Sequence, residues 1–96
     1  MKHDLEGTQY SYELRDLTGR QVIDHHKRLA EATEFVDVVA CRIDDLVAAV
    51  FNADGNAVED VYALSWQEVI IPLAIASVAA LLPKPTSGGD TAKTEG

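Results

Sequence analysis

Two pairs of neighbouring polar residues carry the side chains that metal binding or acid–base catalysis requires. His25 and His26 offer imidazoles, and Asp44 and Asp45 offer carboxylates. Each pair falls within a predicted helix, where adjacent side chains point about 100° apart and cannot meet at one ion or one substrate. We therefore interpret the histidines as surface or helix-seam residues, and both aspartates as charges on a polar stripe.

Cys41 is the single cysteine of the sequence and stands between Ala40 and Arg42. A cysteine nucleophile needs a base beside it, but both histidines lie about four turns earlier on the same predicted helix. One cysteine also excludes an intrachain disulfide and a cysteine-rich zinc site. We expect Cys41 to be a small packing residue. The sequence predicts no catalytic residue, no metal ligand and no cofactor, and the chain is predicted not to be an enzyme.

The charge of the chain is strongly uneven. Sixteen acidic and eight basic residues give a net charge of −8, which argues against a nucleic-acid binder. Residues 31–82 contain nine of the acids and one base, Arg42, and so carry the whole excess. Such a field favours a basic or amphipathic protein partner, although solubility alone would also explain it. The first residues have no apolar core typical of a signal peptide, and we expect a cytoplasmic protein.

A long helix is the main element that the pattern predicts. Thr18 and Gln21 form a capping box, and neither Gly nor Pro follows the helix start until Gly55, which allows a helix over 19–51. Apolar residues repeat every seven positions along it, as in a coiled-coil seam. This heptad row consists of Val22, Leu29, Val36, Ile43 and Val50. The row predicts self-association, and β-branched residues near Thr33 would allow a kink or break.

Two further elements flank this helix. Residues 8–15 alternate with Tyr10, Tyr12 and Leu14 on one side, which predicts a strand paired with the first residues, with 57–62 or with another subunit. Ser65 and Glu68 suggest a second capping box, and the helix after it should kink or restart at an interior proline. Its uncharged stretch, 69–82, is too short to span a membrane, which takes about 20 residues.

The predicted fold is mainly α with a short N-terminal β element (α+β), in which the long helix packs against the capped C-terminal helix. Residues 1–82 form one domain, and 83–96 form a disordered tail because they contain almost no apolar side chains. Trp66 stands at the start of the last helix and could either cover the core or anchor an interface, and we favour the core. The candidate partner-binding residues combine an acidic rim with an apolar floor. They are Asp37, Asp44 and Asp45, with Val36, Val39, Ile43, Leu46 and Trp66.

The order of these elements resembles that of the small tail assembly chaperones of tailed bacteriophages. The resemblance covers residues 8–82 and rests on Leu14-Arg15 at the end of the strand, on Leu64-Ser65-x-x-Glu68 at the helix start, and on the Ala/Val-rich end of that helix. Asp16-Leu17 stands where the family often has a proline. The resemblance implies a non-enzymatic protein that oligomerises in the host cytoplasm and coats a helical client, the tape measure protein. A small acidic inhibitor that mimics charge on a basic site is the alternative.

Overall fold

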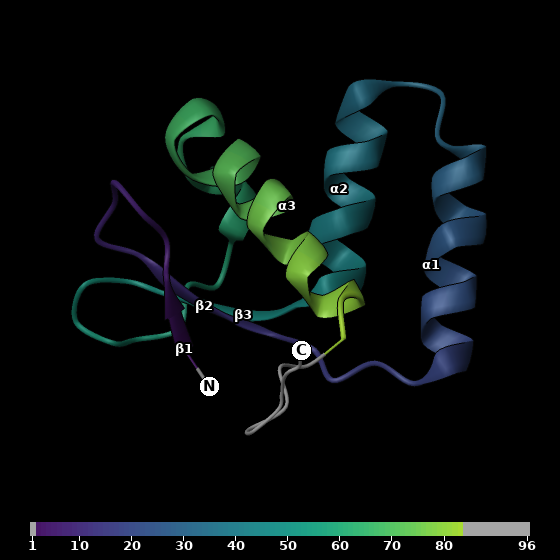
Figure 1. Ribbon diagram of the computed structural model, residues 1–96. Coiled ribbons are helices and arrows are strands. Elements are labelled where there is room, and N and C mark those ends of the chain that lie inside the picture. Colours follow the sequence, from purple (N-terminus) through teal and green to yellow (C-terminus); the bar gives the residue numbers. More distant parts are fainter. Residues whose placement is uncertain (1, 84–96) are drawn as a thin grey trace, which may run out of the picture.

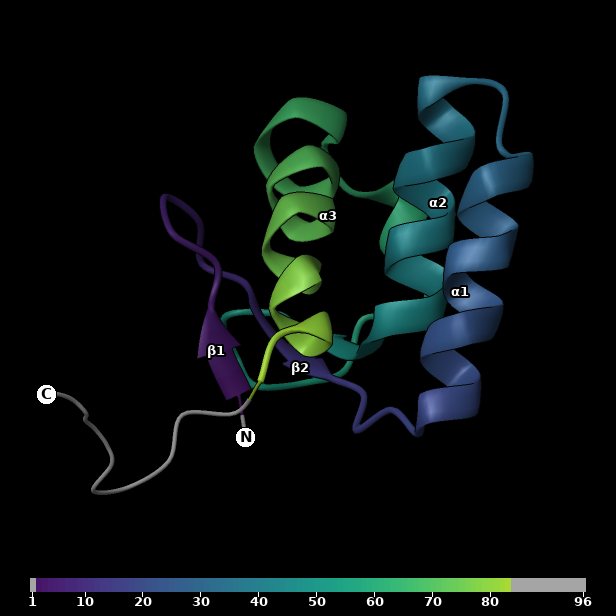
Figure 2. The same cartoon turned by 45° about the vertical axis from the view of Figure 1, so that its right-hand side comes forward.

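The computed structural model describes residues 2–83, which fold as an α+β domain, as predicted. Three short strands form an antiparallel sheet, and three α-helices pack beside it (Figure 1). Figures 1 and 2 show α3 (Ile71–Ser77) beside α2 (Phe35–Leu46), with α1 (Gly19–Glu31) on the far side of α2. The predicted tail lies outside the described residues except for Pro83.

The sheet has the strand order β1 (Lys2–Asp4), β2 (Ser11–Leu14) and β3 (Val47–Phe51). The alternation in residues 8–15 correctly predicted β2, whose Tyr12 is buried. Pairing with the first residues is also confirmed, because Tyr12 lies opposite His3. The alternative pairing with 57–62 is not formed, since the second neighbour of β2 is β3, and residue 57 forms an isolated bridge to the end of β3.

The single long helix predicted over 19–51 is not formed. The Thr18–Gln21 capping box starts α1 as expected, but α1 ends at Glu31 and α2 begins at Phe35. The break falls around Thr33, where β-branching lowers helix propensity. The chain turns back there, so that α1 and α2 form a helical hairpin (Figure 1).

The C-terminal part of the predicted long helix forms the strand β3 instead. Val47 leaves the helical conformation (φ −97°, ψ 126°), and Val47 and Val50 are buried in the core. The Val-Ala-Ala-Val-Phe segment suits either conformation, and β2 supplies the hydrogen-bonding partner that decides for a strand. The heptad row is thereby divided among α1, α2 and β3, and it forms no continuous coiled-coil seam.

The C-terminal helical segment changes from π to α geometry next to its proline. Ser65 Oγ accepts a hydrogen bond from the backbone N–H of Glu68, and a π-helical turn, η2 (Trp66–Ile70), follows. Pro72 lies in the first turn of α3, directly after this π-helical turn, and both Ile70 and Ile71 have α-helical dihedral angles, so the helix continues through the proline. The segment ends with the 3₁₀ turn η3 (Val78–Leu81), close to the predicted boundary.

The core lies where α2 and α3 meet the sheet. Leu46, Ile70 and Leu73 are its most deeply buried apolar side chains, and Tyr12 and Val50 reach it from the sheet. The predicted contact between the middle helical segment and the C-terminal helix is confirmed as the packing of α2 on α3. None of the helices within residues 2–83 has both the length and the apolar character that crossing a membrane requires.

Candidate functional site

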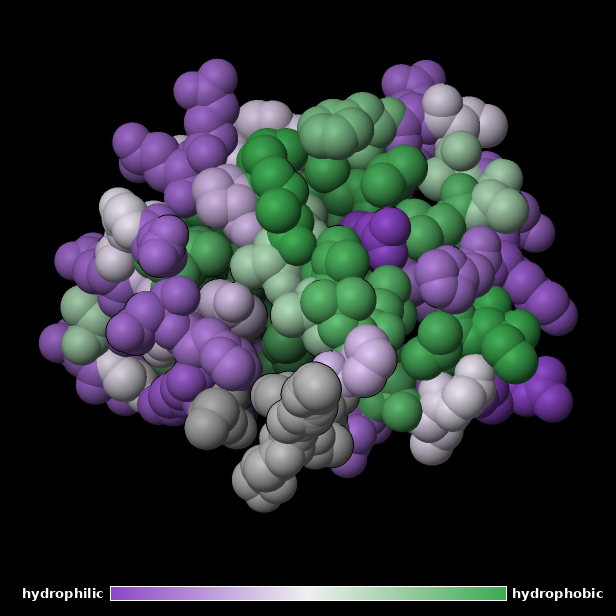
Figure 3. All heavy atoms as spheres, viewed as in Figure 1, coloured by the Kyte–Doolittle hydropathy of each residue, from purple (hydrophilic) through white to green (hydrophobic). Residues whose placement is uncertain are grey.

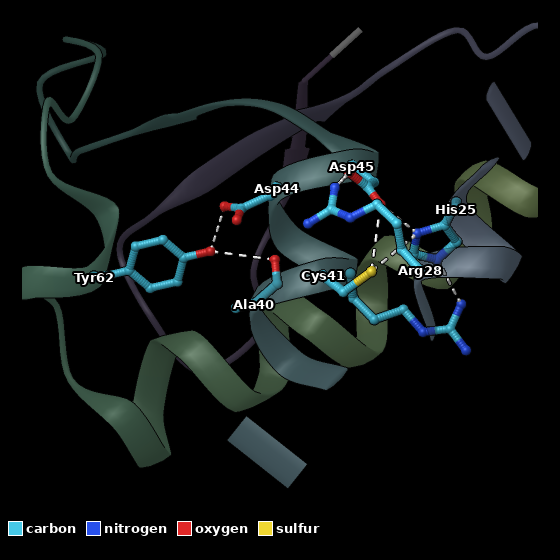
Figure 4. A network of polar contacts seen from close by, with 8 residues as sticks. His25, Arg28, Ala40, Cys41, Asp44, Asp45 and Tyr62 are labelled. Atoms are coloured by element: carbon cyan, nitrogen blue, oxygen red, sulfur yellow. Dashed lines mark hydrogen bonds and ion pairs between the residues drawn. The ribbon is translucent and has the colours of Figure 1, made fainter. Parts of the chain in front are cut away.

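A polar cluster of five residues fills the contact between α1 and α2 (Figure 4). His25 Nδ1 lies 2.8 Å from Asp45 Oδ2 and 3.6 Å from Cys41 Sγ, and Cys41 Sγ lies 3.3 Å from the same Asp45 oxygen. Arg28 donates to Asp45 Oδ1, and Arg42 Nη1 lies 3.1 Å from His25 Nε2. His25 is 1% exposed and Cys41 is 5% exposed, so the centre of the cluster is buried.

These contacts determine the protonation of the imidazole. A guanidinium can only donate, so Arg42 requires His25 Nε2 to be an acceptor. The ring proton of the neutral imidazole then sits on Nδ1 and is donated to Asp45 Oδ2. The carboxylate also accepts from the Cys41 thiol and from Arg28, so every member of the cluster has a hydrogen-bond partner.

The cluster keeps Cys41 as a thiol and Asp45 as a carboxylate. Burial, then the hydrogen bond to Asp45 and its negative charge, raise the pKa of the Cys41 thiol. Burial alone would raise the pKa of Asp45 as well. The hydrogen bonds from His25 and Cys41 and the charge of Arg28 outweigh it and hold the pKa of this carboxyl below its usual range.

This geometry differs from that of a catalytic Cys-His-Asp relay. In such a relay, one ring nitrogen of the histidine faces the nucleophile and the other faces the acid. Here Nδ1 faces both Cys41 and Asp45, while Arg42 occupies Nε2. The un-ionised thiol has no free base to activate it, so the arrangement as it stands does not generate a nucleophile.

This cluster was not predicted from the sequence, because on one unbroken helix His25 would lie about four turns from Cys41. That interpretation was wrong, because the hairpin folds α1 back on α2. The spacing did contain a signal. Positions 25 and 41 are equally far from Thr33, so an antiparallel hairpin centred there brings them opposite one another. Asp45 follows Cys41 by four residues, on the same face of α2.

Asp44 has a different partner from its neighbour. The Tyr62 hydroxyl donates to Asp44 Oδ1 at 2.5 Å and lies 3.4 Å from the backbone carbonyl oxygen of Ala40 (Figure 4). Desolvation, then the hydrogen bond to Asp44 and its charge, raise the pKa of Tyr62 well above its usual value. Asp44 is exposed and Asp45 is partly buried, and both already form hydrogen bonds within the chain. Their assignment to a partner-binding rim stays a prediction.

The structure places the predicted partner-binding residues in different environments. Val39, Ile43 and Leu46 are buried. Ile43 and Leu46 therefore belong to the interior rather than to an open apolar floor, whereas Val39 lines the groove between α2 and α3. Asp37 and Val36 are exposed in the first turn of α2. Trp66 is 43% exposed and contacts the exposed Phe35 rather than the core cluster, in contrast to the favoured interpretation that it covers the core.

An apolar groove between α2 and α3 is the feature that the sequence analysis did not locate. Its volume is about 210 Å³. It is lined by Phe35, Val38, Val39, Arg42, Ile71, Ala74, Ile75 and Val78. Phe35 is 66% exposed and Ile75 is 70% exposed, one on each helix. The ring of Phe35 meets that of Trp66 edge to face, with centroids 6.4 Å apart. Figure 3 shows a hydrophobic band over α3 and the adjoining part of α2.

Comparison with protein-family models, with curated proteins and with solved structures found no match to this chain.

Proposed function

We propose that this chain is a non-enzymatic assembly chaperone that holds an amphipathic helix in the groove between α2 and α3. In the form that the family resemblance suggests, it is a phage tail assembly chaperone, and the helix belongs to the tape measure protein. The observation that carries the proposal is the apolar groove between α2 and α3 with exposed large side chains on both of its walls.

The dimensions of the groove suit side chains of a helical partner. Grooves that receive helices bind a few apolar anchors spaced three or four residues apart. A volume of about 210 Å³ has room for only one or two such anchors. Phe35 and Ile75 stand beside it and lose their water contact when a partner covers them, which makes binding favourable.

Carboxylates on the segments beside the groove favour a basic partner, while the charged residue in the lining itself is the cation Arg42. The segments that carry the Phe35–Trp66 pair also carry three exposed carboxylates, those of Glu34, Asp37 and Glu68. Charges at the rim of a site act mainly on the rate of encounter, whereas apolar contacts set the residence time. The proposed client helix therefore has one apolar face bordered by lysines or arginines.

A short groove that binds each client segment weakly is consistent with a coating role. A long helical client exposes the same apolar stripe over many turns, so several small subunits can each cover a short part of it. Copies bound side by side on one client would bind with a higher overall avidity than a single copy. The homo-oligomer expected from the sequence stays a prediction. Its support now comes from the exposed Phe35, Val36 and Ile75, because the heptad seam is not formed.

The binding proposal can be tested with a tryptophan-free, Leu/Lys amphipathic helical peptide. Trp66, the only tryptophan of the sequence, reports on the groove through its contact with Phe35. We expect saturable fluorescence changes with wild type. Phe35→Ala and Ile75→Ser should weaken binding at least about tenfold, the loss expected for removing an interface anchor.

Ile23→Ser is the matched control, because Ile23 is a similarly exposed isoleucine on α1. It should bind the peptide as wild type does. If Ile75→Ser binds equally well, the groove is not the docking site. Replacing the three rim carboxylates by amides should slow association at low salt and leave dissociation nearly unchanged.

The chaperone role needs a second experiment with the full client. A tape measure protein encoded directly beside this gene would be co-expressed with wild type or with Ile75→Ser. Wild type should keep the client soluble, and Ile75→Ser should not. Client solubility that does not depend on either form would overturn the proposed role even if the peptide binds.

The charge-mimicry alternative is less well supported. It needs regularly spaced carboxylates on one exposed helix face. Asp44 and Asp45 of α2 already hold hydrogen bonds to Tyr62 and to the polar cluster. Asp37 alone of the three predicted rim residues keeps an exposed position with no such side-chain partner among the described residues.

A further inference from the structure

We propose that His25, Cys41 and Asp45 form a binding site for a zinc-type divalent cation, with Nδ1, Sγ and Oδ2 as ligands. The fourth position would be open to water. The site lies between α1 and α2 and meets the α2–α3 groove at Arg42, which contacts His25 and also lines that groove. It does not depend on the proposed chaperone function. The separation of the donor atoms is the first support for it.

The three donor atoms already form one face of a coordination tetrahedron. With Zn–S near 2.3 Å and Zn–N or Zn–O near 2.0–2.1 Å, tetrahedral donors lie about 3.3–3.6 Å apart. The observed separations are 3.6 Å for Cys41–His25, 3.3 Å for Cys41–Asp45 and 2.8 Å for His25–Asp45. The sulfur–nitrogen edge thus fits, the sulfur–oxygen edge must open by about 0.3 Å, and the nitrogen–oxygen edge by about half an ångström.

The donor types select the metal. Sulfur and imidazole nitrogen suit zinc or cobalt, whereas calcium and magnesium prefer oxygen alone. Cys41 and Asp45 are four residues apart on α2, a spacing that puts two ligands on one helix face. His25 comes from α1, so the ion would join the two helices of the hairpin.

Binding requires two proton changes within the cluster. The Cys41 thiol releases its proton to solvent and becomes a thiolate. The proton on His25 Nδ1 is exchanged for one on Nε2, so that Nδ1 offers its lone pair to the ion. Arg42 must then leave Nε2, because two donors cannot face each other.

Arg28 can stay where it is. It binds Asp45 Oδ1, which leaves Oδ2 for the ion, and such a second contact orients a ligating carboxylate. The thiolate and the carboxylate balance the charge of the ion, while the two guanidinium groups oppose it. The structure therefore predicts that Arg42 limits the affinity of the site.

The cluster is reached from two sides. A hollow of about 280 Å³ is lined in part by His25, Arg28 and Asp45, and another of about 300 Å³ by Arg28 and Cys41. Each is much larger than a water molecule, which occupies about 30 Å³ of the liquid. An ion and its remaining water ligand thus have a path to the donors.

The test is titration of the reduced full chain with Co²⁺. A thiolate–cobalt bond gives a charge-transfer band in the near ultraviolet, which the exposed histidines cannot produce. We expect this band to saturate at one equivalent in wild type and in His26→Ala, and to vanish in Cys41→Ser. Zn²⁺ should displace cobalt, raise the melting temperature and protect Cys41 from a thiol reagent until a chelator is added.

Arg42→Gln tests the site through an expected gain in metal affinity rather than a loss. A glutamine oxygen can accept from the Nε2–H of metal-bound His25, so this variant should bind cobalt more tightly, by about tenfold. Absence of the band in wild type, its survival in Cys41→Ser, or no protection of Cys41 by Zn²⁺ would overturn the proposal. The protection of Cys41 by Zn²⁺ is measured on wild type only, so this test remains valid even if a variant fails to fold.

Discussion

His25 Nδ1 lies 2.8 Å from Asp45 Oδ2, and this contact joins the middle of α1 to the last turn of α2. Within α1, all of which the structure describes, His25 is the one fully buried side chain. The core proper is built from the sheet, α2, α3 and the adjoining segments. The polar contact of His25 with Asp45 therefore joins α1 to the domain together with the half-buried Val22 and Leu29.

We expect His25→Ala to lower the free energy of unfolding by about 2–3 kcal/mol, because it leaves a cavity and removes a hydrogen-bond partner from Asp45 and Arg42. Urea unfolding followed by circular dichroism, with a chelator present, measures this loss. His26→Ala is the matched control, since His26 is exposed, and it should change stability by less than about 0.5 kcal/mol. Equal effects of the two variants would contradict the role given to His25.

Tyr62 should make stability fall at alkaline pH. Its pKa is raised in the folded chain, whereas the unfolded chain loses the same proton near pH 10. The stabilisation by the Tyr62–Asp44 hydrogen bond is thus present below about pH 10 and is lost as the pH rises further. Tyr62→Phe lacks this bond at every pH.

Urea unfolding between pH 8 and pH 11 measures the difference. Wild type should be more stable than Tyr62→Phe at pH 8, and the gap should narrow above pH 10. Asp44→Asn should reduce this narrowing because it removes the charge that faces the hydroxyl. A constant gap across this range would show that the hydrogen bond has no influence on the titration of Tyr62.

Two neighbouring positions on α3 separate core packing from surface exposure. Leu73 is fully buried and Ile75 is mostly exposed. We expect Leu73→Ala to destabilise the fold by about 2–5 kcal/mol, as is usual for a truncated core leucine. Ile75→Ala should lower stability by less than about 1 kcal/mol. Thermal and urea unfolding of both variants provide the check, and a large loss for Ile75→Ala would mean that the groove wall is part of the core.

Local signals in the sequence predicted several elements well. Thr18 and Ser65 mark helix starts because their hydroxyl groups can accept from backbone N–H groups three residues later. Tyr10, Tyr12 and Leu14 predicted β2 because side chains of a strand alternate between its faces. These features depend on residues close together in the chain, so they can be recognised without knowledge of the tertiary fold.

The strand β3 could not be assigned in this way. Residues 47–51 continue an apolar helical pattern, and their conformation depends on β2, which lies more than thirty residues earlier. The burial of Val39, Ile43 and Leu46 was likewise decided by what α2 packs against. A periodic pattern shows that a face is apolar, but the same face can serve a core or a partner.

The sequence by itself thus determined the starts of the first and last helical segments, the strand β2, the class of fold and the acidic excess of residues 31–82, all of which follow from local chemistry or composition. Tertiary structure decided which polar residues meet. His25 and Cys41 are sixteen positions apart in the sequence, and their contact exists because the chain reverses around Thr33. An unbroken helix would have kept them about 24 Å apart, at 1.5 Å for each residue, so one three-residue break created the polar cluster.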